Sequence, residues 1–145
     1  MTDTARADAV RQPPEKPRPH AIDVTRPFWD GLNEERLRLQ RCDDCQTWIY
    51  YPRRRCPLCL SDHLTWHDTS GRGTIYTYTV ARQATHPAFA DEVPQLLGVV
   101  ELDEGPRLTT TFVDLGPDDL VVGLPVEAVF DHGPDGITLL RFRPQ

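Results

Sequence analysis

Four cysteines, all that the chain contains, lie within residues 42–59 as two C-x2-C pairs separated by ten residues. Structural zinc prefers four tetrahedral ligands, and thiolates are among its favoured donors. One C-x2-C turn supplies two thiolates and the second pair completes the tetrahedron, so the spacing predicts a Zn²⁺ site held by Cys42, Cys45, Cys56 and Cys59. Four thiolates leave no open coordination position, so this metal would fold the segment and would not catalyse.

Two other uses of the cysteines fit the sequence less well. A redox C-x2-C pair needs a helix that starts at the motif beside a parallel βαβ unit, and no such pattern is readable. Disulfides need an oxidising compartment. Residues 1–20 lack the apolar stretch of a secretory signal, so we expect a cytoplasmic protein with reduced thiols.

The residues beside the cysteines leave alternatives open. Arg41 and the three arginines of residues 53–55 could neutralise the negative charge of a Zn²⁺ held by four thiolates. They could equally form a solvated hairpin tip or, less favoured, a nucleic-acid contact. Many zinc knuckles carry glycine directly after the second cysteine, whereas Gln46 and Leu60 stand there in this chain. This departure weakens the expected knuckle geometry without removing it.

Outside the cysteines, few groups are arranged for catalysis. The sequence contains no G-x-S-x-G, P-loop or G-x-G-x-x-G motif, so we expect no catalytic residues in this chain. His63 and His67 stand four residues apart in a segment of strand or loop character, where two solvent-exposed polar side chains are a better interpretation than a second metal site. His132 lies in the turn-rich segment HGPDG, where a turn role is the simpler interpretation.

Residues 81–95 form a connector that carries more apolar groups than a plain loop needs. His86, Phe89 and Val93 stand there between two predicted strands. Long loops with aromatic residues commonly bind ligands. Phe89 and Val93 could instead cap the open end of a barrel, and the sequence does not separate these two interpretations.

The N-terminal half must position the cysteines. With 145 residues the chain can form one compact domain or two small ones. Residues 1–22 are rich in proline and poor in apolar groups, which predicts a flexible tail or linker. A short helix is expected from Thr25, as a candidate cap, to about Glu35, and an alternating strand from Leu37 into the first cysteine pair. No apolar run reaches the length of a membrane helix, so we expect no membrane association.

The C-terminal half has the character of a small barrel. Five β-rich runs at residues 73–80, 95–105, 107–113, 126–131 and 137–143 are separated by turn signals. Long first and third connections favour a five-stranded Greek-key barrel of the OB type. Residues 1–70 carry eleven basic and eleven acidic groups, whereas residues 71–145 carry five and eleven, so the net charge of −6 lies in this half. It would repel a nucleic-acid backbone.

The order of several segments is more specific than the cysteine spacing. The helix is followed by LRLQRCDDC, CPLC, GRGTIYTYTV, HPAFADEVP, LLGVVELDEGPRL and GLPVEAVF. Together they resemble the DUF35 OB-fold proteins, an acyl-CoA-associated family with a rubredoxin-like zinc ribbon. The resemblance runs from about Arg26 to Phe142. It implies a mainly β chain with a tail at 1–22, a short helix and zinc ribbon at 23–70, and an OB-fold at 71–145.

The resemblance also implies a function without catalysis. Members of the family associate with thiolase-like enzymes, including lipid-transfer-type homologues that cleave steroid side chains by retro-aldol chemistry on CoA thioesters. The catalytic residues lie on that partner, while the DUF35 chain stabilises it and helps to form the acyl-CoA site. Some members are fused behind MaoC-type hydratase domains. On this basis Phe28, Trp29, His86 and Phe89 are candidates for the acyl-CoA or partner surface, although packing in the core is an equally good interpretation of Phe28 and Trp29.

Three hypotheses follow. The preferred one is an accessory subunit of a thiolase-like enzyme, with structural Zn²⁺ and a CoA thioester as the ligand of the complex. The second is a free-standing acyl-CoA-binding protein. The third, a nucleic-acid module that uses the ribbon and the barrel, needs basic flanks around aromatic platforms, and the acidic barrel does not provide them.

Overall fold

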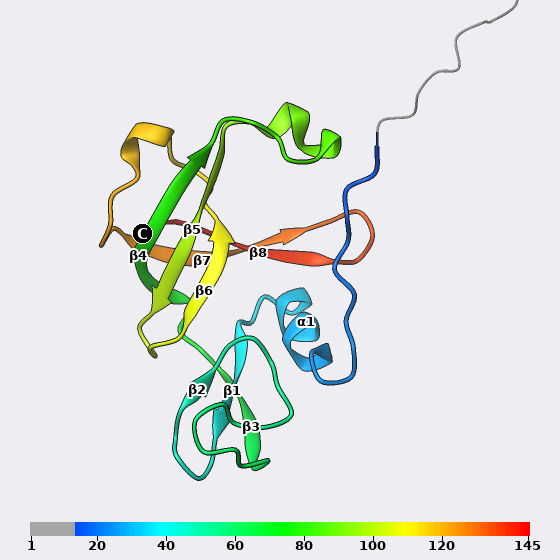
Figure 1. Cartoon of the computed structure of the whole chain (residues 1–145), viewed down its shortest axis with the longest axis vertical. Coiled ribbons are helices and arrows are strands. Elements are labelled where there is room, and N and C mark those ends of the chain that lie inside the picture. The colour runs from blue at the N-terminus through cyan, green and yellow to red at the C-terminus, as the bar shows by residue number, and fades with distance from the viewer. Residues whose placement is uncertain (1–13) are drawn as a thin grey trace, which may run out of the picture.

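The computed structural model describes residues 14–145, so residues 1–13 of the predicted tail lie outside the described part. The chain forms a zinc-ribbon lobe and a β-barrel lobe with one helix between them (Figure 1). The elements are α1 (Arg26–Asn33), β1 (Arg38–Cys42), β2 (Trp48–Ile49), β3 (Leu64–Asp68), β4 (Arg72–Ala81), η1 (Pro87–Glu92), β5 (Gln95–Leu102), β6 (Arg107–Thr111), η2 (Pro117–Asp119), β7 (Pro125–His132) and β8 (Thr138–Pro144).

Helix α1 buries one face and ends earlier than the sequence predicted. Phe28 and Leu32 are buried on the face that meets the barrel. The helix stops at Asn33, not near Glu35, because Glu35 adopts a left-handed backbone (φ 58°) and the next amide donates back to the Gly31 carbonyl at 2.8 Å. Thr25 is the N-cap residue, as the sequence predicted, but its hydroxyl hydrogen-bonds to the Ile22 backbone and caps no helical amide.

The ribbon lobe is a three-stranded antiparallel sheet in the order β2-β1-β3. The central strand β1 begins close to the predicted strand start and leads directly into Cys42, as the alternating sequence indicated. Leu39 of β1 is fully buried, and it belongs to the same core as the barrel. The strand therefore connects the metal-binding end of the ribbon to the main hydrophobic core.

The barrel lobe contains the five predicted strands, in the order β6-β5-β4-β7-β8. All hydrogen-bonded pairs in this sheet are antiparallel, and a parallel bridge between Phe112 and Phe142 brings its two edges together. The Val113 amide donates to the Phe142 carbonyl at 2.9 Å. A Cβ at Gly98 would lie 2.5 Å from the Phe112 ring and 2.4 Å from the Thr77 carbonyl oxygen, so this closure requires glycine. The sheet thus forms a nearly closed OB-type barrel.

The two lobes share one hydrophobic core. Buried residues of α1 and the ribbon (Phe28, Leu32, Leu37 and Leu39) belong to the same cluster as barrel residues such as Val100, Leu108 and Phe142. Helix α1 therefore closes one end of the barrel and fixes the ribbon beside it (Figure 1). Among residues 14–145, no helix is both long and apolar enough to cross a bilayer.

Residues 14–22 have no helix or strand, and they run beside the β7–β8 hairpin (Figure 1). Lys16 forms an ion pair with Glu92 of η1 and lies over the Phe89 ring, and Arg18 pairs with Asp135 at 2.9 Å. This segment is thus held against the barrel by charged contacts at its surface.

Candidate metal centre and interaction groove

The four predicted ligands converge on one point. Their sulfur atoms all lie within 4.8 Å of one another, and the Cys42–Cys59 and Cys45–Cys56 pairs are each 3.5 Å apart. A tetrahedron with Zn–S bonds of about 2.3 Å has sulfur separations of about 3.8 Å. None of the four is in a disulfide, which would bring two sulfurs to about 2.05 Å. The donor set and its spacing therefore fit one tetrahedral Zn²⁺.

Two knuckles with the same hydrogen bonds supply the ligands. In the first, the Gln46 amide donates to the Cys42 carbonyl at 2.9 Å; in the second, the Leu60 amide donates to the Cys56 carbonyl at 3.0 Å. Gln46 and Leu60 have φ angles of 63° and 64°, the left-handed region that favours glycine. The expected knuckle geometry is therefore present, although Gln46 and Leu60 stand where glycine is usual. Both residues adopt a backbone conformation that is strained for a non-glycine residue.

The arginine that precedes each cysteine pair supports its knuckle. Arg41 Nε donates to the Gln46 carbonyl and Arg55 Nη1 to the Leu60 carbonyl, each at 3.2 Å. The sequences RCDDCQ and RCPLCL are thus one motif used twice. Hydrogen bonding with Thr47 lowers the pKa of the Cys45 thiol to about 6, whereas desolvation and the neighbouring thiols raise the pKa of Cys59 to about 12, so Cys45 loses its proton before Cys59.

A buried glutamine, which the sequence analysis did not single out, fixes the loop between the knuckles. Gln40 is 5 % exposed; its Nε2 donates to the Arg53 carbonyl at 3.0 Å and its Oε1 accepts from the Arg53 amide at 2.7 Å. Both hydrogen bonds go to backbone atoms of one residue, so Gln40 holds the loop at Arg53. Alternation with Leu37 and Leu39 predicts an exposed side chain at this position, so no local pattern in the sequence signalled the burial of Gln40.

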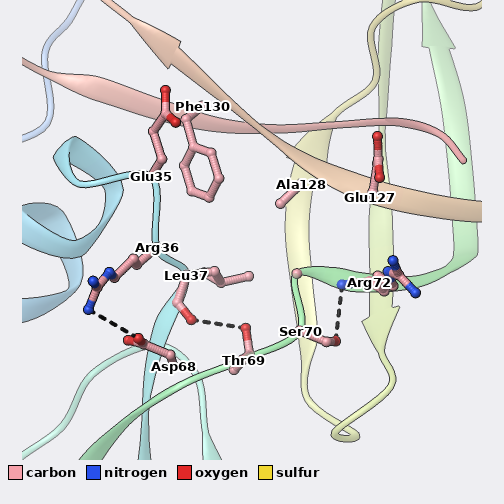
Figure 2. Close-up of a pocket in the computed structure, with 11 residues that line it drawn as sticks. Glu35, Arg36, Leu37, Asp68, Thr69, Ser70, Arg72, Glu127, Ala128 and Phe130 are labelled. Atoms are coloured by element: carbon pink, nitrogen blue, oxygen red, sulfur yellow. Dashed lines mark hydrogen bonds and ion pairs between the residues drawn. The ribbon is translucent and has the colours of Figure 1, made fainter.

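A cleft of about 330 Å³ marks the junction between the lobes (Figure 2). Thr69 extends the β1–β3 pairing beside it, because its amide and its hydroxyl both donate to the Leu37 carbonyl at 2.9 Å. Two ion pairs lie beside it: Arg36 with Asp68 at 3.5 Å, as Figure 2 shows, and Glu127 with Arg143 at 2.8 Å. The cleft is thus lined by residues of both lobes, from Leu37 and Asp68 on the ribbon side to Glu127 and Phe130 of β7.

A second, more apolar groove brings together three of the four weaker candidates. It has a volume of about 400 Å³ and lies between α1, the segment after β2, η1 and the barrel. Trp29 Nε1 donates to the Tyr51 hydroxyl at 3.0 Å, and the Phe28 ring packs edge-on against Trp29 at 5.2 Å. We call this the aromatic groove; its walls include Phe28, Trp29, Tyr51, Phe89, Leu97 and Leu139.

The fourth candidate, His86, has a positioning role in the structure. Its Nδ1 accepts the Ala88 amide at 3.1 Å and so caps η1, and its ring lies edge-on to Phe89 at 6.1 Å. Phe89 lines the aromatic groove, and neither Phe89 nor Val93 belongs to the barrel core. The connector 81–95 thus presents Phe89 at the groove, and this observation favours the binding-loop interpretation over the barrel-cap one.

The other histidines make contacts within the chain. His63 is exposed beside Asp44, at 3.2 Å, and His67 accepts or donates a hydrogen bond with Thr65 at 2.9 Å. The only group of possible metal ligands among residues 14–145 is the cysteine cluster. His132 connects the lobes, since Nε2 lies 3.1 Å from Glu35 and Nδ1 lies 2.9 Å from the buried Thr138 hydroxyl.

Comparison with known proteins matches both lobes. Residues 29–65 match the family model of the ChsH2 rubredoxin-like zinc ribbon domain, and residues 66–131 match that of the ChsH2 C-terminal OB-fold domain. A DUF35 domain-containing scaffold protein of Methanocaldococcus jannaschii is 37 % identical over 112 residues, which cover 72 % of this chain and 78 % of the relative. A probable enoyl-CoA hydratase alpha subunit of Thermomonospora curvata is 38 % identical over 130 residues.

The lengths of these relatives differ. The match covers 89 % of this chain but only 40 % of the Thermomonospora protein. Among solved structures, a chain of the "Ltp2-ChsH2(DUF35) aldolase" superposes with a TM-score of 0.79 at 35 % identity, over 88 % of this chain and 98 % of that one. A DUF35 protein of Sulfolobus solfataricus shares the fold with a TM-score of 0.61 at 14 % identity.

Helix, four-cysteine ribbon and OB barrel occur here in the order that these matches share, and the relatives of similar length carry the same two lobes. The chain belongs to the DUF35 family of zinc-ribbon and OB-fold scaffold proteins.

Proposed function

We propose that this chain is a non-catalytic accessory subunit of a thiolase-like, lipid-transfer-type enzyme that acts on acyl-CoA thioesters. In this function it forms a hetero-oligomer, stabilises the catalytic chain and contributes to the acyl-CoA site. The reaction is C–C bond cleavage or formation, with retro-aldol cleavage in steroid side-chain degradation as the specific case. The similar Ltp2-ChsH2(DUF35) aldolase, whose name pairs a DUF35 chain with a second protein, supports this proposal.

The aromatic groove is the observation that carries the proposal. Trp29 and Phe89 are sixty residues apart in the sequence, yet both line this apolar groove. A half-buried tryptophan and an aromatic loop residue are the side chains most enriched where one protein anchors another. All four cysteines point into the metal cluster, so none of them is available as a nucleophile.

The name of the longer Thermomonospora relative supports a further element of the proposal. It is called an enoyl-CoA hydratase alpha subunit, and the matched region is 40 % of its length. A MaoC-type hydratase domain is therefore a second proposed partner, either joined to a DUF35 region or working beside it. Both proposed partners handle CoA thioesters, so in this proposal the chain connects two enzymes of the same substrate class.

Co-expression with a thiolase-like chain of the same organism tests the proposal. We expect a stable hetero-oligomer with one zinc per copy of this chain in size-exclusion chromatography with light scattering. Trp29→Ala with Phe89→Ala should weaken the complex at least tenfold, because both substitutions remove anchors from the groove. Val122→Ser is the matched control, since Val122 is 62 % exposed and does not line the groove.

Two outcomes would contradict the accessory role. A chain that forms no complex with any thiolase-like partner would overturn it. Binding of a CoA thioester by the isolated chain in calorimetry, without a partner, would support the alternative of a free-standing acyl-CoA-binding protein.

A further inference from the structure

The second knuckle exposes two leucines at the tip of the ribbon. Leu58 is 71 % exposed and Leu60 is 67 % exposed, and neither belongs to a hydrophobic cluster of the chain. Every residue from 53 to 60 is exposed except Cys56. The ligand Cys59 stands between the two leucines and is itself exposed, so this side of the metal centre has no cover from the described part of the chain.

The knuckle geometry does not require these leucines. The first knuckle has the same backbone hydrogen bonds and the same arginine support, yet it carries Asp44 and Gln46 at the corresponding positions. Asp44 pairs with His63, and Gln46 Nε2 donates to the Asp43 carbonyl at 2.6 Å. The polar side chains of the first knuckle therefore find their partners within the chain.

Leu60 has a second unfavourable feature. Its φ angle of 64° lies in the left-handed region, which glycine adopts without strain but which strains a residue with a side chain. Gln46 has the same backbone but makes a local side-chain hydrogen bond, which leucine cannot make. A strained, exposed and unpacked apolar residue is a local inconsistency that points to a contact outside the chain.

Positive charge lies next to the leucines. Arg55 supports the Leu60 carbonyl, whereas Arg53 and Arg54 form no ion pair within residues 14–145. Gln40 fixes the backbone of Arg53 from the buried side, so the two free guanidinium groups project from a held loop. The chain as a whole has a net charge of −6, which makes this a local basic patch on an acidic protein.

We propose that Leu58 and Leu60, with Arg53 and Arg54 beside them, form a docking tip for the thiolase-like chain. The complementary surface is an apolar pocket, which accepts the two leucines, with carboxylates at its rim for the two arginines. This inference rests on the proposed function and adds a second contact, separate from the aromatic groove. Charge complementarity at a rim steers association and fixes orientation, while buried apolar anchors slow dissociation.

A protein fits this tip better than other occupants. A nucleic acid would use the arginines but would leave the leucines without apolar contact. An anionic membrane would attract the arginines but repel Asp44 and Asp62, which are exposed on the same ribbon. A shaped protein surface can contact the leucines and arginines while it avoids the carboxylates.

Exchange of the knuckle side chains tests the proposal. Leu58→Asp with Leu60→Gln gives the second knuckle the residues of the first, so zinc content and folding should be retained. We expect the dissociation constant of the complex with the thiolase-like chain to rise at least tenfold in surface plasmon resonance. Arg53→Gln with Arg54→Gln should lower the association rate and reduce its dependence on salt.

A glycine pair provides the matched control. Leu60→Gly relieves the left-handed strain, so the isolated, zinc-loaded chain should melt no lower than the wild type while complex formation weakens. Gln46→Gly makes the same backbone change on the first knuckle and should leave the affinity for the partner unchanged.

The outcomes separate this inference from the proposed function. If the wild-type chain forms no complex, both are overturned. If the wild-type complex forms and the variants of Leu58 and Leu60 bind with unchanged affinity, only the docking tip is overturned. Wild-type binding to phosphatidylserine vesicles or to single-stranded RNA that the leucine variants lose, with complex affinity unchanged, would also overturn the docking tip and assign it to that other ligand.

Discussion

Replacement of Gln40 by methionine should destabilise the ribbon without removing a metal ligand. Methionine has about the same length and fills the buried site, but it can neither donate to the Arg53 carbonyl nor accept from the Arg53 amide. Two hydrogen bonds are lost, and each contributes about 1 kcal/mol net. Because Arg53 lies in an exposed loop, water can reach its backbone once the loop moves, and we add no further penalty.

The expected loss is therefore about 2 kcal/mol. For a chain of this size that corresponds to a fall in Tm of about 4–8 °C. Thermal unfolding followed by circular dichroism, in buffer with constant free zinc, measures this change. Hydrogen exchange gives the local readout, since the Arg53 amide should exchange faster in Gln40→Met than in the wild type.

Gln83→Met is the matched control, because Gln83 is exposed and its substitution should change the stability by less than about 0.5 kcal/mol. A Gln40→Met chain that melts within about 1 °C of the wild type, with unchanged exchange at Arg53, would refute the reasoning. In that case the loop between the knuckles would be held by the metal alone.

Two other measurements address the metal centre and the segment before α1. Cys56→Ser removes a fully buried ligand, so the zinc content should fall below half of the wild-type value and the ribbon should melt earlier; full zinc content with an unchanged melt would contradict the metal assignment. The Lys16 ion pair lowers the pKa of Glu92 from its usual 4.5, so its stabilisation is present above that pH and is lost as the pH falls through the lowered folded value. Lys16→Met should therefore raise the pKa of Glu92 towards 4.5 in an NMR titration, and an unchanged pKa would show that residues 14–22 do not hold this contact in solution.

Local patterns in the sequence predicted the elements of the fold. The two C-x2-C pairs predicted the metal ligands because a tight turn places both cysteines of a pair on one ion. The five β-rich runs correspond to the five strands of the barrel, since alternation and turn residues act over short distances. The end of α1 was missed by two residues, because a left-handed Glu35 terminates the helix where glycine would be the usual signal.

Part of the candidate site also followed from local sequence. The family resemblance singled out Phe28, Trp29 and Phe89 as candidates, and Phe89 also stood in a connector with more apolar groups than a plain loop needs; the structure places all three on one groove. His86 was singled out with them, but its observed contact caps η1, which a sequence cannot separate from a contact with ligand. The roles of these residues in binding remain predictions for the experiments above.

Only the tertiary structure decided how distant segments meet. The sequence by itself determined the candidate zinc ligands, the strand order along the chain and the family resemblance, because each depends on residue type and spacing. It did not reveal that Gln40 holds Arg53, that the two knuckles are one motif with opposite surface chemistry, or that α1 closes the barrel beside the aromatic groove. These features depend on contacts between residues far apart in sequence and on backbone angles at non-glycine positions, and neither leaves a periodic pattern in the sequence.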